Sequence, residues 1–379
     1  MVRPSPAAAN LSPSIIREMS RRKGPTTLDL TLGQPGRDPD PDILERALEA
    51  HARGPQGYTE NAGLLALREA IARHHGRAGP EEVIVTVGSE QALYLALSST
   101  VSPGDEVLIP EPGYPAYPGI PRLLGAEAVT YPITREGGLV PSVEDIADRV
   151  GPKTRAVIWN APSNPFGSIP DRAATEAMAR LAEEKDLVLV SDEIYRDLTY
   201  GGADFVGPAD LSSSALLVGG LSKSCALTGF RLGYLCGPAE LIAKATLVHQ
   251  LMVTCAPRLS QLMAIEVFSD PSRLKAHLPD YAEARAALEG ARDALPVPEA
   301  LSLGEGAFYA IVDVSAYLGS GSTLDLALEL LAKEDVAVVP GLAFGASGDW
   351  FWRLSYAAGA ASASEGLRRI GRFLRAREG

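Results

Sequence analysis

The sequence predicts an α/β fold in which a mostly parallel sheet is covered by helices on both faces. Short apolar runs alternate with helical segments through the middle of the chain. Runs that are apolar throughout are typical of parallel strands, which are buried on both faces, and their alternation with helices indicates repeated strand–helix–strand units. The strands predicted in this part are 83–87, 106–109, 156–159, 187–190 and 215–218.

The two ends of the chain predict a second, smaller α/β domain. Near the N-terminus, a helix at 11–22 and a strand at 27–32 lead into the sharp turn Gly33-Gln34-Pro35-Gly36. After a long helix at 281–294, strands and helices alternate again in the C-terminal part. They are a strand at 307–312, a helix at 324–331, strands at 336–339 and 353–356, and a closing helix. We therefore expect a large domain at 37–281 and a small domain formed by 1–36 and 282–379.

Apolar residues at helical spacing predict the helices of the large domain. In the segment 41–53, Ile43, Leu44, Ala47 and Leu48 lie on one face, and in 64–74 Leu64, Leu67 and Ile71 form the apolar stripe. Further helices are predicted at 90–98, 241–251 and 260–268.

Composition excludes several classes of protein. The chain has 379 residues, enough for two or so domains, and its formal charge of −12 gives no reason to bind nucleic acid or an anionic membrane. No apolar run approaches the ~18 residues of a membrane span. The three cysteines are an odd number without C-x-x-C spacing, which is typical of reduced thiols in a cytoplasmic protein. The five histidines are scattered, so we expect no metal site.

The polar residues with chemical potential fall just after the predicted strands. They are Ser89 and Glu90, Tyr114, Asn164, Asp192 and Tyr195, and Ser222 with Lys223. In open α/β sheets, ligands bind beyond the carboxyl ends of the strands. Position alone therefore predicts one shared site.

The stretch from Gly219 to Tyr234 carries the most specific chemistry. Its one lysine, Lys223, is flanked by Ser222 and Ser224, and Arg231 follows eight positions later. This grouping suits a phosphorylated aldehyde, because the amine can form a Schiff base while the hydroxyl and guanidinium hold the phosphate. Ser89 and Glu90 begin a helix, where free N–H groups and the helix dipole add a seat for an anion.

Asp192 directly follows an apolar run, so we expect its carboxylate to be buried and to need a cationic partner. A Walker-type metal site is a poor alternative because the chain has no G-x-x-x-x-G-K-[ST] motif. It also lacks G-x-G-x-x-G, the main support for a nicotinamide-dependent dehydrogenase.

Three motifs in this order carry a resemblance to a known family: N-A-P-S-N-P-F-G at 160–167, D-E-I-Y at 192–195 and S-K-x₇-R at 222–231. From about Thr27 to the final helix, the chain resembles the fold-type-I, pyridoxal-phosphate-dependent aminotransferases of class I/II, the aspartate aminotransferase superfamily. The resemblance implies that Lys223 carries pyridoxal 5′-phosphate and moves the proton in catalysis, and that Asp192 pairs with the ring nitrogen of the cofactor.

The resemblance assigns the other site residues as well. Tyr195 and Asn164 would bond the phenolic oxygen of the cofactor, and Tyr114 would stack on its ring. The phosphate would be held by Ser89, Glu90, Ser222 and Arg231. On the substrate side, Arg353 in R-L-S-Y would bind the α-carboxylate together with Asn164, and Gly33 would let the backbone approach the substrate.

Tyr58, in G-Y-T-E-N-A-G, matches a tyrosine that in relatives reaches the phosphate across a dimer interface. The resemblance therefore implies a homodimer with shared active sites. It also implies a cis peptide bond between Asn164 and Pro165.

Four positions depart from the family pattern or leave it open. Phe166 stands where relatives usually have threonine, and Gly220 stands where many have a serine or threonine of the phosphate seat. Met252 aligns with an arginine that binds the side-chain carboxylate in aspartate-specific relatives, which favours an uncharged or aromatic substrate side chain. Arg258 is close enough to keep a dicarboxylate possible.

The expected function is the exchange of an amino group between an L-amino acid and a 2-oxo acid, both small molecules. The alternative on the same fold is a pyridoxal-phosphate-dependent β-lyase of the C–S lyase type. A cofactor-sensing regulator is a third hypothesis. The acidic charge and the short segment before the first strand argue against the DNA-binding domain that such regulators carry.

Overall fold

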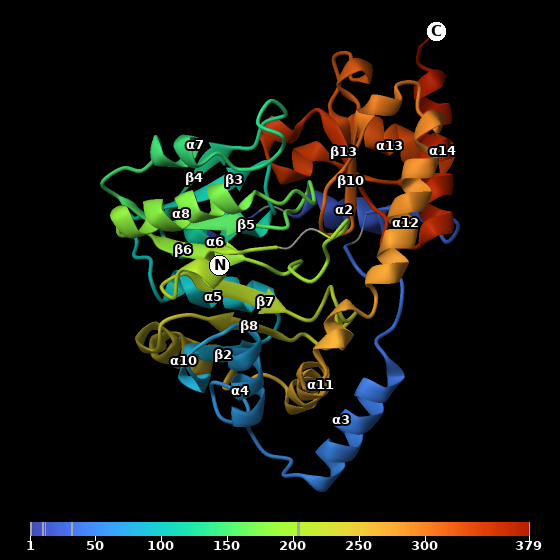
Figure 1. Cartoon of the computed structure of the whole chain (residues 1–379). Coiled ribbons are helices and arrows are strands. Elements are labelled where there is room, and N and C mark those ends of the chain that lie inside the picture. Colours follow the sequence, from blue (N-terminus) through green and yellow to red (C-terminus); the bar gives the residue numbers. More distant parts are fainter. Residues whose placement is uncertain (1, 10, 12, 32, 203–204, 379) are drawn as a thin grey trace.

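The computed structural model describes residues 2–9, 11, 13–31, 33–202 and 205–378, and its centre is a seven-stranded sheet (Figure 1). The strand order is β2-β8-β7-β6-β5-β3-β4. All neighbouring pairs from β7 to β4 are parallel, whereas β8 runs antiparallel to both β7 and β2. The strands are β2 (Val83–Thr86), β3 (Glu106–Glu111), β4 (Glu127–Pro132), β5 (Thr154–Asn160), β6 (Val188–Asp192), β7 (Leu216–Gly220) and β8 (Gly233–Cys236).

Helices cover both faces of this sheet because alternate strand residues are apolar on each side. Val107 and Ile109 belong to one core cluster, with α5 (Ser89–Ser98), α6 (Ala116–Leu123) and α10 (Ala239–Val253). Leu108 belongs to the core of the other face. That core holds residues of α3 (Pro41–Arg53), α4 (Leu65–His74), α7 (Val143–Ala147), α8 (Arg172–Glu184), α9 (Pro208–Leu211) and α11 (Arg258–Ser269).

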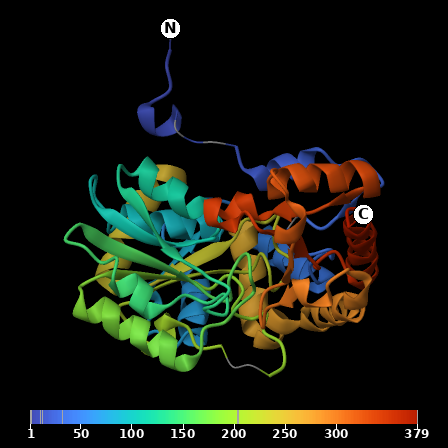
Figure 2. The ribbon, with the colours of Figure 1, turned by 90° about the horizontal axis from the view of Figure 1, so that it is seen from above.

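A separate core joins the two ends of the chain. Met19 and Leu30 pack in one cluster with Leu367 and Ile370, and in Figure 2 the blue helix α2 (Ile15–Arg21) lies beside the orange and red C-terminal elements. Its antiparallel sheet has the order β12-β13-β10-β9, and β1 pairs in parallel with β11. The strands are β1 (Leu28–Asp29), β9 (Leu301–Leu303), β10 (Tyr309–Asp313), β11 (Val336–Ala337), β12 (Val339–Pro340) and β13 (Phe351–Ser355). The helices of this core are α2, α12 (Leu278–Gly290), α13 (Thr323–Glu334) and α14 (Ala360–Arg375), whereas α1 (Pro6–Ala9) contacts α6.

The predicted fold class is confirmed, but several element boundaries were wrong. The strand predicted at 27–32 is reduced to β1, because the Asp29 carboxylate accepts hydrogen bonds from the Thr31 backbone and hydroxyl at 2.9 and 2.6 Å and turns the chain. Leu32 lies outside the described residues. The strand predicted at 336–339 is two strands that pair in different sheets. The helix predicted at 281–294 begins earlier, at Leu278, and ends at Gly290.

Candidate active site

The polar residues singled out in the sequence gather at the carboxyl ends of β2, β5, β6 and β7. Because β8 runs back beside β7, the loop 221–232 that joins them stays at this edge of the sheet. The loop carries both Lys223 and Arg231, so the amine and the guanidinium are mounted on one short segment.

Lys223 is partly buried at the centre of the site, and its Nζ donates a hydrogen bond to the Gly33 carbonyl at 2.6 Å. Burial, together with the positive charges of Arg353 and Arg231, lowers the pKa of Lys223 to about 8, whereas Asp192 and Glu90 act in the opposite direction. An amine with this pKa is partly neutral near physiological pH and can act as a nucleophile or a base. Ser222, the preceding residue, is buried beside it.

Asp192 ends β6 and is 7% exposed. One carboxylate oxygen accepts from the Tyr117 hydroxyl at 2.8 Å and the other from the Ile194 backbone N–H at 3.3 Å. Burial raises the pKa of Asp192, since no cation of the described chain forms an ion pair with it, although the charge of Lys223 opposes the shift. The Asp192 carboxylate can therefore pair with a bound cation, because no cationic side chain in the described ranges forms an ion pair with it.

Arg353 on β13 is a buried cation without a carboxylate partner in the described chain, the reverse of Asp192. Its side chain is 2% exposed, and it donates to the Asn164 side-chain oxygen at 2.9 Å and to the Thr31 carbonyl. Its guanidinium carbon lies 4.2 Å from the centre of the Tyr309 ring. Burial lowers the pKa of Arg353, and the groups that oppose this are tyrosines; in the part of the chain that the structure covers, no carboxylate pairs with it. The peptide bond between Asn164 and Pro165 is cis, as predicted.

Two tyrosines that the sequence did not single out complete this region. Tyr309 shares a hydrogen bond of 2.6 Å with the Tyr195 hydroxyl, and a side chain at Gly33 would place its Cβ 2.1 Å from the Tyr309 oxygen. Position 33 therefore has no room for a side chain. Tyr117 follows Tyr114 by three residues in E-P-G-Y-P-A-Y, so that repeat was the available signal for it. No local signal marks Tyr309.

The residues at the start of α5 form a candidate anion-binding site. Gly88 caps this helix with φ of 81°, and a Cβ there would lie 2.4 Å from a guanidinium nitrogen of Arg231. The guanidinium of Arg231, an exposed residue, therefore sits beside the free N–H groups of the first turn, to which Ser89 and Glu90 belong. A helix N-terminus with an arginine beside it suits a phosphate group.

The remaining predicted residues make no hydrogen bond or ion pair to Lys223, Asp192 or Arg353 in the described chain. Tyr114 is partly buried, with its ring edge-on to Tyr117 at 5.6 Å between centroids. Tyr58 is 88% exposed, and Met252 is 46% exposed on α10. The Arg258 guanidinium packs against Gly54 at the end of α3, where a Cβ would lie 2.3 Å from it.

Comparison with known proteins identifies the family. A family model described as "Aminotransferase class I and II" matches residues 25–369. The chain belongs to the class I and II aminotransferases. It is 36% identical over 365 residues to the aspartate/prephenate aminotransferase of Thermus thermophilus, an alignment that covers 93% of this chain and 92% of that one.

Solved aminotransferase structures share the whole fold. The aspartate aminotransferase of Thermus thermophilus with maleate has a TM-score of 0.90 at 34% identity, covering 98% of this chain and 100% of that one. The aromatic aminotransferase of Pyrococcus horikoshii has a TM-score of 0.87 at 31% identity, with 96% and 99% covered.

These relatives support transaminase activity, so the protein is a pyridoxal-phosphate-dependent aminotransferase. Members of this family use pyridoxal phosphate and act on amino and 2-oxo acids. The β-lyase alternative is not favoured. Within the described ranges, no helix combines the length and the apolar character that crossing a bilayer requires.

Proposed function

We propose that this aminotransferase holds pyridoxal 5′-phosphate at Lys223 and exchanges an amino group between an L-amino acid and a 2-oxo acid. One observation carries the proposal: Asp192 and Arg353 are buried, oppositely charged and each without an ion pair in the described chain, and they lie at one site with Lys223. A buried charge is costly unless it is paired. A cationic ring nitrogen would pair with Asp192, and a substrate carboxylate would pair with Arg353.

The chemistry of the side chains fits the cofactor group by group. The negative Asp192 suits the protonated ring nitrogen, whereas Arg231 and the first turn of α5, with Ser89, Glu90 and Ser222, suit the phosphate. Tyr195 and Asn164 suit the phenolic oxygen, and Tyr114 suits the ring face. When bound, the cofactor supplies an aldehyde for the amino group and a ring that accepts electrons from the substrate Cα.

The protein's own residues then bind, orient and move protons. Lys223, whose pKa is about 8, can take a proton from the substrate Cα as a base and return it as an acid near physiological pH. Arg353 would bind the α-carboxylate, and its guanidinium is already fixed by Asn164, Thr31 and the Tyr309 ring. Because the guanidinium is already fixed, little side-chain entropy is lost when the substrate binds.

We also propose a homodimer whose sites are shared. Exposed apolar side chains gather near the end of α10 and the loop before α4: Leu251 and Tyr58 are each 88% exposed and Leu247 is 56% exposed. The Asn61 side chain donates to the Thr254 carbonyl at 2.8 Å and so joins the two segments. A second copy would cover this surface, and Tyr58 would reach the phosphate of the partner's site, where Gly220 provides no hydroxyl.

Two further proposals concern organisation and location. We propose that residues 37–281 form the cofactor-binding domain and that 1–36 with 282–379 form the small domain, which the separate core of the chain ends supports. We propose a cytoplasmic enzyme, supported by the three free cysteines.

Borohydride trapping tests the cofactor assignment. The purified protein is expected to be yellow, and reduction followed by peptide mass mapping should place the adduct on Lys223; an adduct on another lysine contradicts the proposal. A screen of amino donors against 2-oxoglutarate and pyruvate then defines the substrates. A β-lyase would instead release ammonia without any 2-oxo acid acceptor.

A further inference from the structure

Side-chain hydrogen bonds hold the loop that carries Lys223 from outside, and two of them lie at Lys223 or two residues after it. The Tyr281 hydroxyl, on α12, donates to the Lys223 carbonyl at 3.3 Å. The Cys225 thiol donates to the Arg273 carbonyl at 3.6 Å. Burial raises the pKa of Cys225 to about 12, so the thiol keeps its proton and remains a donor at neutral pH. Tyr281 lies in the first turn of α12, and Arg273 lies shortly before this helix.

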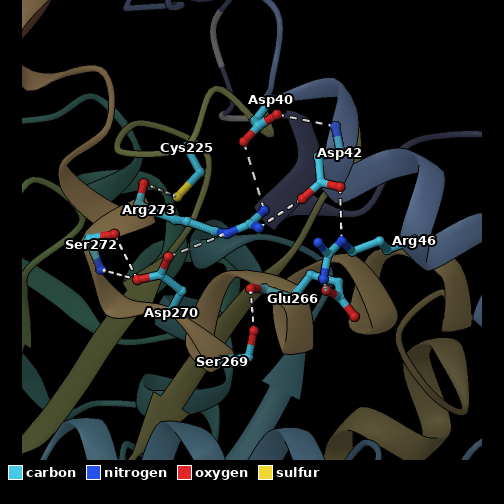
Figure 3. Close-up of polar contacts among 9 residues, drawn as sticks. All are labelled: Asp40, Asp42, Arg46, Cys225, Glu266, Ser269, Asp270, Ser272 and Arg273. Carbon is cyan, nitrogen blue, oxygen red and sulfur yellow. Dashed lines mark hydrogen bonds and ion pairs between the residues drawn. The ribbon is translucent and has the colours of Figure 1, made fainter.

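The Arg273 side chain is itself clamped between two elements (Figure 3). Its guanidinium lies 2.8 Å from an Asp42 oxygen and 3.7 Å from an Asp40 oxygen at the start of α3, and 3.9 Å from an Asp270 oxygen. Asp40 also caps α3, and Asp270 caps the short helix η2 (Pro271–Lys275). The carbonyl that accepts the Cys225 thiol therefore belongs to a residue whose position is fixed relative to α3.

The residues that make these contacts lie where the chain passes between the two proposed domains. α3 begins shortly after the turn that contains Gly33, whose carbonyl accepts the Lys223 Nζ. η2 leads into α12, which bears Tyr281. The side chain of Lys223 is thus tied to one connecting segment and its carbonyl to the other, while Arg273 ties the two segments together.

We propose that Tyr281 and Arg273 are positioning residues for Lys223, fixing its main chain so that Nζ is presented at the correct point of the site. The proposal rests on the assignment of Lys223 as the cofactor-bearing lysine. Ordinary packing does not require these contacts: the Tyr281 ring already packs on Phe308 at 5.3 Å, and a phenylalanine would fill the same space. The hydroxyl is the part that reaches Lys223.

The first test measures amide hydrogen exchange of residues 221–231 in the cofactor-free protein. Tyr281→Phe and Arg273→Gln should each exchange about fivefold faster in this loop, the ratio that corresponds to a lost hydrogen bond of about 1 kcal/mol. Arg273→Lys keeps one ionic contact and should lie between parent and Arg273→Gln.

The chain offers matched controls for both variants. Tyr356→Phe removes a buried hydroxyl that also donates to a carbonyl at 3.3 Å, that of Ala307. Arg46→Gln removes a guanidinium that donates to the same Asp42 at 2.8 Å (Figure 3) and whose hydrogen bonds and ion pairs in the described chain do not reach the Lys223 loop. Exchange of the loop should match the parent in both controls.

A second readout follows Lys223 in the loaded enzyme. The pH midpoint of the cofactor's visible band should move in Tyr281→Phe and Arg273→Gln, and kcat should fall about five- to tenfold with KM unchanged, because ~1 kcal/mol of positioning is lost. Loop exchange and midpoint equal to those of the controls would overturn the positioning role alone. A borohydride adduct on another lysine would overturn the proposed function and this inference with it.

Discussion

Replacing Asp192 by asparagine tests the electrostatic core of the site. The change removes the negative charge and keeps the shape of the side chain. Its oxygen can still accept from the Ile194 N–H, and its amide can donate to the Tyr117 hydroxyl, which also accepts hydrogen bonds. Both contacts of the side chain are kept, with the Tyr117 hydroxyl changed from donor to acceptor, so the main effect of the substitution is the loss of the negative charge.

The expected loss of rate follows from the charge on the ring nitrogen. A neighbouring carboxylate favours the protonated form by ~1–3 pK units, which corresponds to a factor of about 10–10³. Single-turnover rates with an amino acid should fall by about this factor. The cofactor should remain bound, because Lys223, Arg231 and the start of α5 are the groups proposed to hold the rest of it.

The cofactor-free protein should respond in the opposite direction. Burial raises the folded-state pKa of Asp192 above its unfolded value, so the ionised carboxylate destabilises the folded protein at pH 8. Asparagine removes this cost. With an unfolding entropy of about 2.1 cal/mol/K for each of 379 residues, the melting temperature should rise by about 1.3 °C per kcal/mol. Below about pH 4, where both states are protonated, the difference should vanish.

Calorimetry of cofactor-free protein and stopped-flow measurements on loaded enzyme check both results. Near-normal turnover with cofactor bound would refute the pairing with the ring. A clear fall in the melting temperature of the cofactor-free variant would show that the carboxylate already has a stabilising partner within the protein.

Four further predictions address other parts of the site. The rate at which cofactor-free protein takes up pyridoxal phosphate should rise through about pH 8, the pKa of Lys223, and Lys223→Ala should abolish the borohydride adduct; a midpoint above pH 10 would contradict the buried amine. Arg353→Lys should lower kcat/KM by about 10–150-fold, since one or more charged hydrogen bonds of about 1.5–3 kcal/mol are lost, and an unchanged value would remove Arg353 from carboxylate binding. Gly220→Ser should lower the melting temperature slightly, because a Cβ there lies 3.1 Å from Ile194 and 3.2 Å from the Leu232 carbonyl; a stabilised variant would show that the pocket has room. Mixed refolding of Lys223→Ala with Tyr58→Ala should restore activity above either parent variant, and absence of recovery in proven mixed dimers would place Tyr58 within its own subunit or outside the site.

The sequence was most informative where strands are buried on both faces. β5 and β7 have continuous apolar runs, so they were found to within two residues at each end. β4 was missed because its residues Glu127–Pro132 are largely half-exposed at the edge of the sheet and lack an apolar run. β8 was missed because Gly233–Cys236 is short and follows a motif interpreted only as chemistry.

Site prediction had a similar limit. Lys223, Asn164 and Asp192 each stand in a contiguous motif, whereas Tyr309 is one aromatic residue in strand β10. Its part in the site follows from its hydrogen bond to Tyr195, 114 positions away. The contribution of Thr31 is a backbone carbonyl, which any residue type provides. Contacts of these kinds arise only from the tertiary fold.

The hydrogen bond from Arg353 to Thr31, 322 positions apart, has a consequence for synthesis of the chain. The proposed cofactor-binding residues of one subunit's own site lie between Ser89 and Arg231, so a chain growing from its N-terminus contains all of them well before Arg353 is made. The Thr31 carbonyl and the Asn164 side-chain oxygen therefore lack this hydrogen-bond donor until Arg353 has been synthesised. The residues proposed to hold the cofactor are therefore synthesised before Arg353, the residue proposed to bind the substrate carboxylate, whose strand β13 lies near the end of the chain.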